Sequence, residues 1–438
     1  MTSSMRALSK VLTLAVLLAP AAARAQDTTF RGISLGGTYD PHGKVGITVL
    51  PITGAFGDSV RAIVGRDLDF SDRFTVIGVD TTDLDALRAP GAAAGLNYAI
   101  FTRIAASAVV QITTVATGLH IALHDVAKGQ VVNVAEMPLP ANGLSRDWRM
   151  AVHRASDEIE RWVTNTRGIA ATRIAYVRGQ SIRIVDSDGA AEITVPTEEC
   201  GVSPAWNPSA TSLVYATCGV DSRIHLIDLA TGRSSTLVGP TRNAIYITPS
   251  FSPDGASIVY SRRNEDQADL FLMSLARPEA PARLTANRNV ENTNPVFSPD
   301  GRRITYVSSL IGRPELYIMD ADGTDAHVLT DYDFSDKNYR SDPDWSPDGL
   351  RVVYQERLND RFQIRTILVS GSTPKLWTSE GVNEQPSWSP DSRHLVFTST
   401  RTGVRQLWIM DIESGRMRQL TKSAGSKLAS WSARIAGQ

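Results

Sequence analysis

Short apolar runs recur through the C-terminal two thirds of the chain, and each run is bounded by turn residues. One cycle contains Leu213–Tyr215 and Ile224–Ile227, and the next contains Ile258–Tyr260 and Leu270–Met273. The runs are rich in β-branched and aromatic residues, and Pro-Asp-Gly or Asp-x-x-Gly turns separate them. This alternation predicts consecutive antiparallel hairpins rather than amphipathic helices.

An aromatic box precedes each cycle. Its fullest form is Pro-x-aromatic-Ser-Pro-Asp-Gly, as in Pro295–Gly301. The aromatic positions repeat at intervals of 43 to 48 residues: Trp206, Phe251, Phe297, Trp345, Trp388 and Trp431. Four short strands for every repeat of this length predict the blade of a β-propeller.

The two ends of the repeat region are incomplete in complementary ways. Residues 173–195 contain three predicted strands with no box before them, whereas the box at Trp431 has no strands after it. The C-terminal strand should therefore complete the first blade and leave no open edge. We expect a six-bladed β-propeller over residues 166–438, closed by this strand.

Residues 26–165 contain no copy of the box and predict a small N-terminal α/β domain. Apolar residues with helical spacing mark one helix around Val60–Leu68 and a second helix at Trp148–Trp162. Strands are expected at Val45–Leu50, Phe74–Ile77, Tyr98–Phe101, Val109–Val115, Leu119–Val126 and Val131–Val134. The second helix should pack on the sheet that these strands form.

The first 25 residues have the pattern of a secretory signal peptide. Arg6 and Lys10 precede the apolar run Val11–Ala19, and Ala23–Ala25 fits a small-x-small cleavage site. We expect cleavage between Ala25 and Gln26, with no lipid anchor because no cysteine stands there. An apolar run of this length is too short to span a bilayer, so the exported chain should be soluble.

Composition excludes several classes of protein. The chain has 45 basic and 46 acidic residues, so it lacks the charge excess of a nucleic-acid-binding protein. Its two cysteines cannot form a disulfide scaffold or a four-thiolate zinc site. Cys200 and Cys218 flank a predicted hairpin, and either a cross-strand disulfide or two buried free thiols fits this spacing.

No motif predicts catalysis. Gly32–Gly36 matches G-x-S-x-G but lacks the core strand and the helix that a nucleophile elbow requires. His120 and His124 lie on a predicted strand, where a separation of four does not form a helical metal pair. Asp320–Asp325 resembles a calcium loop, but predicted strands flank it, so hairpin turn chemistry explains it better. We expect no enzyme, no metal and no cofactor.

The order of these parts resembles the TolB family, the periplasmic propellers of the Tol–Pal system. Ala171–Val177 resembles the start of that family's propeller, and Ala155–Ile159 fits the last helix before it. The resemblance implies a non-catalytic periplasmic interaction protein that supports outer-membrane integrity and envelope constriction at cell division. In the family, the propeller face binds the lipoprotein Pal and the N-terminal segment binds TolA, so association with the envelope would occur only through protein partners.

The resemblance also suggests two sets of partner-binding residues. The TolA-binding segment would comprise Gln26, Asp27, Thr28, Thr29, Phe30 and Arg31. The propeller mouth that binds Pal would be lined by loops just before the boxes, at Ser203, Thr248, Thr293, Asp342 and Gln385. Each of these loop residues is equally compatible with an ordinary solvated turn.

A second function from a different class remains open. An exported propeller can bind or process a glycan or another small molecule. Acidic or histidine side chains should then converge on the channel, and the boxes supply Asp254, Asp300, Asp348 and Asp391. Their position in predicted turns weakens this alternative.

Overall fold

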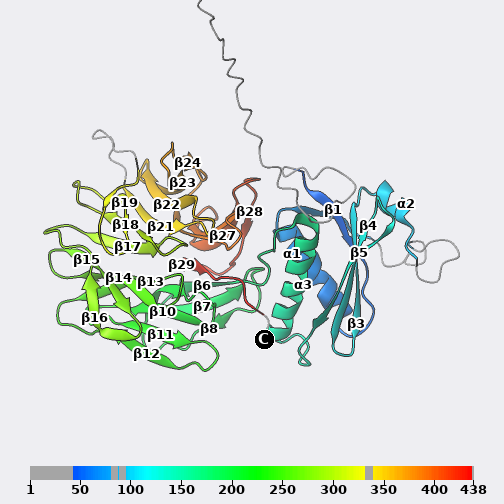
Figure 1. Cartoon of the computed structure of the whole chain (residues 1–438), viewed down its shortest axis with the longest axis horizontal. Helices are drawn as coiled ribbons and strands as arrows, with labels where there is room; N and C mark the ends of the chain where they lie inside the picture. Colours follow the sequence, from blue (N-terminus) through cyan, green and yellow to red (C-terminus); the bar gives the residue numbers. More distant parts are fainter. Residues whose placement is uncertain (1–42, 80–86, 88–94, 331–338, 437–438) are drawn as a thin grey trace, which may run out of the picture.

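The computed structural model describes residues 43–79, 87, 95–330 and 339–436. The expected signal peptide, the segment Gln26–Arg31 and the Gly32–Gly36 motif lie outside the described residues. Figure 1 shows a β-propeller on the left and an α/β region on the right. Two helices of the α/β region, α1 (Gly57–Phe70) and α3 (Arg146–Thr164), lie between its sheet and the propeller.

The propeller has six blades, and each blade is a four-stranded antiparallel sheet. This architecture confirms the fold expected from the repeats. Blade 1 contains β9 (Gly201–Trp206), β10 (Ser212–Thr217), β11 (Ile224–Asp228) and β12 (Ser234–Val238); blade 2 contains β13 (Ile245–Phe251), β14 (Ser257–Arg263), β15 (Ala268–Ser274) and β16 (Arg277–Arg283); blade 3 contains β17 (Asn292–Phe297), β18 (Arg303–Ser308), β19 (Glu315–Asp320) and β20 (His327–Val328). Blade 4 contains β21 (Arg340–Trp345), β22 (Arg351–Leu358), β23 (Arg361–Leu368) and β24 (Lys375–Leu376); blade 5 contains β25 (Asn383–Trp388), β26 (His394–Ser399), β27 (Gln406–Asp411) and β28 (Met417–Gln419); blade 6 contains β29 (Ser426–Trp431), β6 (Arg173–Arg178), β7 (Ser181–Asp186) and β8 (Ile193–Thr194).

The C-terminal strand closes the ring as the repeat pattern predicts. In blade 6, β29 pairs with β6, and the register sets Trp431 opposite Ile174 and Ser430 opposite Ala175. Trp206 of blade 1 donates its indole N–H to the Ser430 carbonyl at 3.0 Å, which ties the first blade to the last strand. Closure of this kind leaves the ring without an unpaired inner edge.

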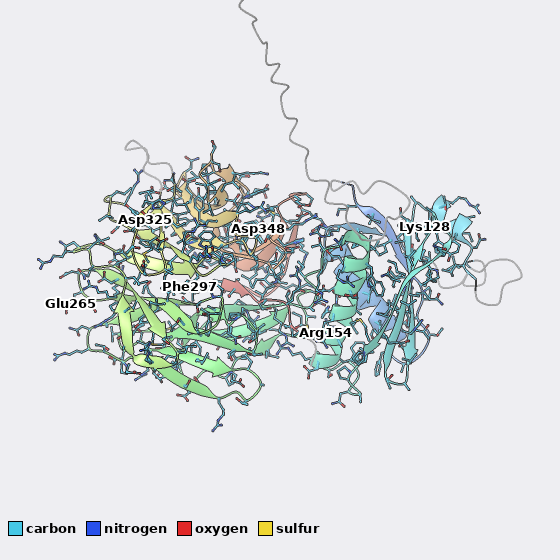
Figure 2. The ribbon with its side chains drawn as sticks, in the orientation of Figure 1. Lys128, Arg154, Glu265, Phe297, Asp325 and Asp348 are labelled. Atoms are coloured by element: carbon cyan, nitrogen blue, oxygen red, sulfur yellow. A yellow bond between two sulfur atoms is a disulfide. The ribbon has the colours of Figure 1, made fainter. Side chains whose placement is uncertain are left out.

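The aromatic box has two structural roles: its aromatic residue packs against the preceding blade, and its Ser-Pro-Asp-Gly residues form the hairpin turn. Phe297, which lies inside the propeller in Figure 2, packs against Val259 and Leu270 of the preceding blade. Asp300 accepts hydrogen bonds from the Ser298 hydroxyl at 2.5 Å and from the Arg302 amide at 3.1 Å. Gly301 follows with φ of 72°, a left-handed conformation that costs glycine nothing. The box therefore fixes each hairpin and covers the neighbouring blade.

The α/β region contains a five-stranded sheet in the order β2-β1-β3-β4-β5. Its elements are β1 (Val45–Val49), α1, β2 (Phe74–Val76), α2 (Tyr98–Arg103), β3 (Ala108–Val115), β4 (Gly118–Asp125), β5 (Gln130–Pro138) and α3. Val60, Val64 and Leu68 of α1 and Val152 and Ile159 of α3 are buried in one core with the sheet. None of the helices in the described ranges is long and apolar enough to cross a membrane.

One predicted strand of this region is wrong. Tyr98–Phe101 belongs to the helix α2, not to the sheet. Phe101 is fully buried against Val109 and Val126, on the sheet face opposite to Val110 and its helices. A short apolar run does not distinguish a strand from a buried helical turn, and contacts with this second core favour the helix.

Candidate functional site

The two ends of the propeller are built from different loops. Ile245, the first residue of β13, pairs with Arg263, the last residue of β14. The segments that enter the channel-lining strands and the turns between the second and third strands therefore lie at one end, which we call the mouth face. The box turns and the turns between the third and fourth strands lie at the other end, which we call the turn face.

A ring of left-handed residues lines the central channel. Each first strand contains a bulge in its pairing with the second strand. One residue in each bulge has φ between 50° and 56°: Ser203, Thr248, Asn294, Asp342, Gln385 and Leu428. These six residues and the two that follow each of them line a cavity of about 170 Å³. Bulges that twist inner strands and re-aim their side chains are common beside functional sites.

Four of the five residues expected to line the mouth line the channel cavity, and Asn294 stands there in place of Thr293. The structure places Ser203, Thr248, Asp342 and Gln385 within the inner strands rather than in loops, and all four line the cavity. Thr293 pairs with Val307 in the sheet, and its neighbour Asn294 occupies the ring position. The sequence contains a signal for this assignment, because Asn294 directly precedes Pro295 as the other four precede their prolines.

Leu428 is the ring residue that the sequence analysis missed. It occupies the sixth position with φ of 55°. Ala429 follows it where the other five blades have proline, so the proline pattern gives no signal for this blade. The spacing of Leu428 from Trp431 is the same as that of Gln385 from Trp388, and this was the available clue.

Hydrogen bonds link neighbouring ring positions across the blades. The Asn294 amide N–H donates to Thr248 Oγ1 at 3.3 Å, and Asn294 Nδ2 donates to Asp342 Oδ1 at 2.8 Å. On the other side of the ring, the Leu428 amide N–H donates to Gln385 Oε1 at 3.0 Å. These contacts hold the channel wall in one arrangement, so the cavity is a preformed recess.

Blade 4 makes the recess acidic. Asp342 and Asp344 both line the cavity. Burial raises the pKa of each carboxyl to about 6, although Ser341 donates to Asp342 and the Trp345 and Trp388 amides donate to Asp344. Both groups are therefore largely ionised at neutral pH.

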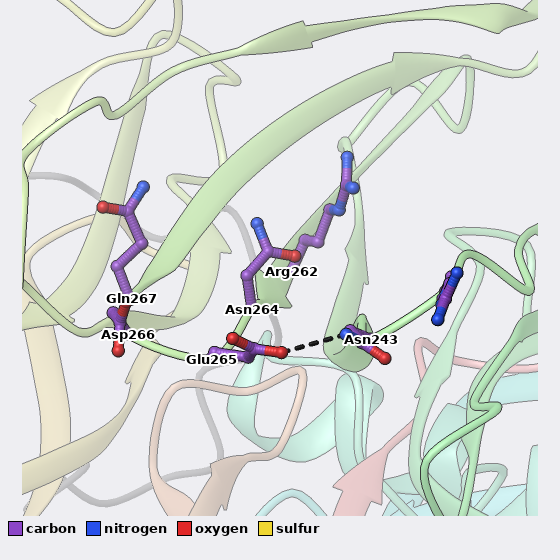
Figure 3. A pocket seen from close by; sticks show the side chains of 7 residues that line it. Asn243, Arg262, Asn264, Glu265, Asp266 and Gln267 are labelled. Atoms are coloured by element: carbon purple, nitrogen blue, oxygen red, sulfur yellow. Dashed lines mark hydrogen bonds between the residues drawn. The ribbon is translucent and has the colours of Figure 1, made fainter.

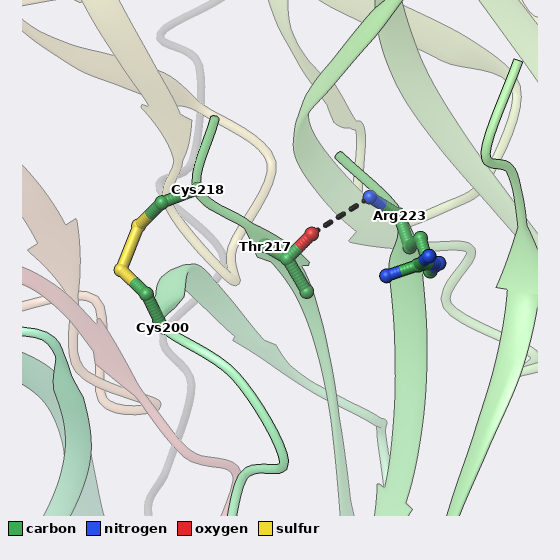
Figure 4. Close-up of a disulfide and its surroundings, with 4 residues drawn as sticks. All are labelled: Cys200, Thr217, Cys218 and Arg223. Carbon is green, nitrogen blue, oxygen red and sulfur yellow. Dashed lines mark hydrogen bonds between the residues drawn. A yellow bond between two sulfur atoms is a disulfide. The ribbon is translucent and has the colours of Figure 1, made fainter. Parts of the chain in front are cut away.

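A disulfide lies beside the ring on the mouth face. Cys200 and Cys218 are bonded, with their Cα atoms 5.5 Å apart, immediately before β9 and immediately after β10 (Figure 4). The Cys218 amide donates to the Cys200 carbonyl at 3.2 Å. This hydrogen bond extends the pairing of β9 with β10 to the disulfide. The Arg223 amide donates to Thr217 Oγ1 at 2.8 Å and orders the adjoining loop.

A second hollow on the mouth face lies at the rim of blade 2. It has a volume of about 430 Å³ and is lined by Arg242, Asn243, Arg262, Asn264, Glu265, Asp266 and Gln267. Asn243 Nδ2 donates to Glu265 Oε1 at 2.9 Å across it (Figure 3). Figure 2 places Glu265 at the outer edge of the propeller. Both basic and acidic side chains line this hollow, so its described lining does not favour a ligand of one charge.

The box aspartates do not converge on the channel. Asp254, Asp300, Asp348 and Asp391 each accept a hydrogen bond from the serine of their own box, on the turn face. None of the four lines the channel cavity in the described part of the chain. The acidic cluster that the glycan or small-molecule alternative required from these residues is therefore not formed.

The other candidate ligands have separate local partners. His120 contacts Glu136 across β4 and β5, whereas His124 lies 2.9 Å from Tyr98 Oη and 3.1 Å from Gln111 Oε1. The Asp320–Asp325 segment forms the turn between β19 and β20, where Asp322 Oδ1 accepts from the Thr324 amide at 3.0 Å. These contacts match turn and sheet roles.

Comparisons with known proteins agree with this architecture. Residues 160–435 match the family described as the TolB beta propeller domain. The chain is 30% identical over 277 residues to the Tol-Pal system protein TolB of Francisella tularensis subsp. holarctica, covering 58% of this chain and 61% of that protein. It is 28% identical over 184 residues to an uncharacterized protein of Agrobacterium fabrum, covering 41% of this chain and 59% of that protein. The alignments thus span about three fifths of the length of these relatives.

A solved structure shows the same fold over a larger part of the chain. The crystal structure of TolB from Acinetobacter baumannii superposes with a TM-score of 0.76 and 24% sequence identity. The superposition covers 90% of this chain and 98% of that one, so it includes the α/β region as well as the propeller. With its six blades, its ring closure and the family match over residues 160–435, this chain belongs to the TolB beta-propeller family.

Proposed function

We propose that this chain is a non-catalytic interaction protein of the Tol–Pal system in the periplasm. Its mouth face would bind Pal, and its segment Gln26–Arg31 would bind TolA. Through these two partners it would support outer-membrane integrity and envelope constriction at cell division. Membership of the TolB family and the relative named as a Tol-Pal system protein support this proposal.

The observation that carries the Pal-binding part is the preformed recess at the centre of the propeller. It is ringed by six inner strands and has a volume of about 170 Å³, which suits one protruding group of a folded partner. The described part of the α/β region packs against the turn face through Arg393 and Arg416, at the end of the propeller opposite to the recess opening. A rigid concave surface loses little conformational freedom when a partner binds.

The TolA-binding part depends on the chain upstream of Gly43. An extended polar segment can add as a strand to the sheet edge of a partner, where backbone hydrogen bonds provide the affinity. Gln26–Arg31 has the composition for this mode, with four polar residues followed by Phe30 and Arg31.

Calorimetric titration of residues 26–438 with the soluble domain of Pal from the same organism tests the proposal. We expect saturable one-to-one binding. Ser250 lines the cavity, so Ser250→Phe should fill the recess and weaken binding at least about tenfold, or about 1.4 kcal/mol. Asp254→Ala lies on the turn face and is the matched control, which should bind as the unchanged protein does.

A second chain lacking residues 26–37 separates the two partners. It should lose TolA binding and retain the fold. Absence of heat with Pal from a protein that circular dichroism shows to be folded would contradict the Pal assignment. The glycan or small-molecule alternative would then become the leading explanation for the recess.

A further inference from the structure

The α/β region meets the turn face of blades 5 and 6 through charged side chains, which include the fully buried His153 and the partly exposed pair Asp69 and Arg416. The helices α1 and α3 and the turn after α1 contribute one side of this interface. A cavity of only about 10 Å³, lined by residues that include Asp67, Asp188 and Arg418, lies within it. The space holds about one water molecule, so the charges there face each other without bulk solvent.

The first group of charges, which we call the blade 6 patch, has basic groups on the α/β region and acidic groups on the propeller. Arg149 Nη2 of α3 lies 2.7 Å from Asp188 Oδ2. His153 Nε2 of α3 lies 3.9 Å from both Asp186 Oδ2 and Asp188 Oδ2, and its Nδ1 lies 2.8 Å from Asp67 Oδ2 of α1. The fully buried His153 ring hydrogen-bonds Asp67 through Nδ1, whereas its Nε2 faces the two blade 6 carboxylates beyond hydrogen-bond distance.

The second group, which we call the blade 5 patch, has charges of both signs on each side, and Arg73 of the α/β region lies 4.0 Å from Asp391 of the propeller. Here the α/β region supplies Asp69 and Asp72, and the propeller supplies Arg416 and His394. Arg416 lies 2.8 Å from Asp69 Oδ2 and 3.0 Å from Asp72 Oδ1. His394 Nε2 lies 3.7 Å from Asp72 Oδ2, while its Nδ1 lies 2.9 Å from Asp391 Oδ2 of its own blade.

Each patch places charges of opposite sign against each other across the interface. Displacing the α/β region would leave buried charges without their partners, which is strongly unfavourable. We propose that these patches form a charge latch that fixes the α/β region on the propeller in this orientation, and that the latch opens at alkaline pH when His153 and His394 lose their protons. The proposal does not rest on the identity of the partners.

The surroundings of both histidines favour the imidazolium form. Burial alone would lower the pKa of His394, but the Asp391 carboxylate, the contact with Asp72 and the charge of Asp411 raise the pKa to about 9. The same balance of burial against Asp67, Asp188 and Asp186 raises the pKa of His153. The charged groups around His394 come from both parts of the chain. The α/β region contributes Asp72, Arg73 and Glu160, and blade 5 contributes Asp391, Arg393, Asp411 and Arg416. The charged groups around His153 are Arg66, Asp67, Arg149, Asp186, Asp188 and Arg418.

The sign of the pH effect follows from these directions. A histidine with a raised pKa contributes stability that is complete below its ordinary value of about 6.5 and is lost as the pH rises through the raised value. Asp72 and Asp188 have lowered pKa values because the histidine and arginine charges outweigh their burial. Their contribution is lost only in acid, so the latch is complete near neutral pH and opens above about pH 9.

A divalent metal ion is the competing occupant of these clusters. In each of two clusters, the potential ligand atoms lie within 4.8 Å of one another. One cluster contains Asp67, His153 and Asp188, and the other contains Asp72, His394 and Asp411. Arginines already neutralise the carboxylates, since Arg393 Nη2 lies 2.7 Å from Asp411 and Arg416 contacts Asp72. A metal ion would add positive charge beside these guanidinium groups, which favours the protonated histidine instead.

Double electron–electron resonance on the full chain tests the latch, because it measures the distance between a spin label on the α/β region and one on the propeller. Spin labels are attached at Arg103→Cys on α2 and Val404→Cys on blade 5, both exposed, while Cys200 and Cys218 stay bonded. We expect a narrow distance distribution at pH 7 that broadens above about pH 9. Asp72→Asn should shift this broadening to lower pH by roughly one unit. The matched control is His327→Gln on β20, the exposed outer strand of blade 3, and this substitution should change nothing.

Charge exchange provides a test that is independent of titration. Arg416→Asp should broaden the distribution at pH 7, and adding Asp69→Arg should recover at least part of the narrow distribution. A distribution that stays narrow up to pH 10.5, with unchanged circular dichroism, would overturn the proposal. So would a double variant as broad as the single variant, or broadening at pH 7 by a chelator alone, which would assign the clusters to a metal ion.

Discussion

Trp431 is the residue whose loss should most directly weaken ring closure. It lies on β29, which is joined to β6 from the opposite end of the propeller sequence. Its indole packs between Val396 and Leu407 of blade 5 and Ile174 of blade 6, and only 6% of it is exposed. Its Nε1 donates to Thr172 Oγ1 at 2.8 Å. One side chain therefore connects two blades and the start of the propeller.

The expected cost of Trp431→Ala follows from this burial. Truncation of a buried tryptophan to alanine costs about 3 to 5 kcal/mol, because apolar contacts are lost and a cavity remains. Loss of the hydrogen bond to Thr172 adds about 1 kcal/mol. A total of about 4 to 6 kcal/mol is a large share of the roughly 5 to 15 kcal/mol that typically separates folded and unfolded proteins.

Urea unfolding followed by far-ultraviolet circular dichroism measures this change. The matched control is Trp377→Ala, because Trp377 is only partly buried beside the outer strand β24 and donates to Thr366 Oγ1 at 2.9 Å. We expect the control to lose less than about half as much stability. If the two variants lose the same free energy, the conclusion that Trp431 is a closure residue is refuted.

Three further predictions follow from local features. Reducing the Cys200–Cys218 bond should lower the free energy of unfolding by about 2 to 4 kcal/mol, measured with and without reductant, with the Cys200→Ser, Cys218→Ser chain as the reference. Because the pKa of His394 is raised to about 9, the urea midpoint should fall as the pH rises from 7 to 10, and His394→Gln should reduce this slope and leave the part that comes from His153. Ser145 caps α3 by accepting from the Trp148 amide at 3.2 Å, so Ser145→Ala should cost about 1 kcal/mol in the same assay, whereas Ser145→Asp should cost little.

The channel ring shows where local sequence stops being sufficient. The residue before each box proline marks the ring position, Asn294 included, whereas the bulge that turns this residue into the recess forms only when the strand pairs with β18. A shift of one residue moves a side chain to the other face of a strand. Leu428 shows the same limit, because its place in the ring follows from closure of blade 6 and not from a proline after it.

The number of blades, the closing strand and the α/β region before the propeller all follow from the amino-acid sequence. Each repeat carries its own turn residues, such as the Ser298–Asp300 pair, and its own apolar strands, so these features are written locally. The helical conformation of Tyr98–Phe101 and the paired charges between the two parts depend instead on contacts between distant segments. Arg393 and the Asp72 carbonyl are 321 positions apart, and no local pattern specifies which buried charge meets which across such a distance.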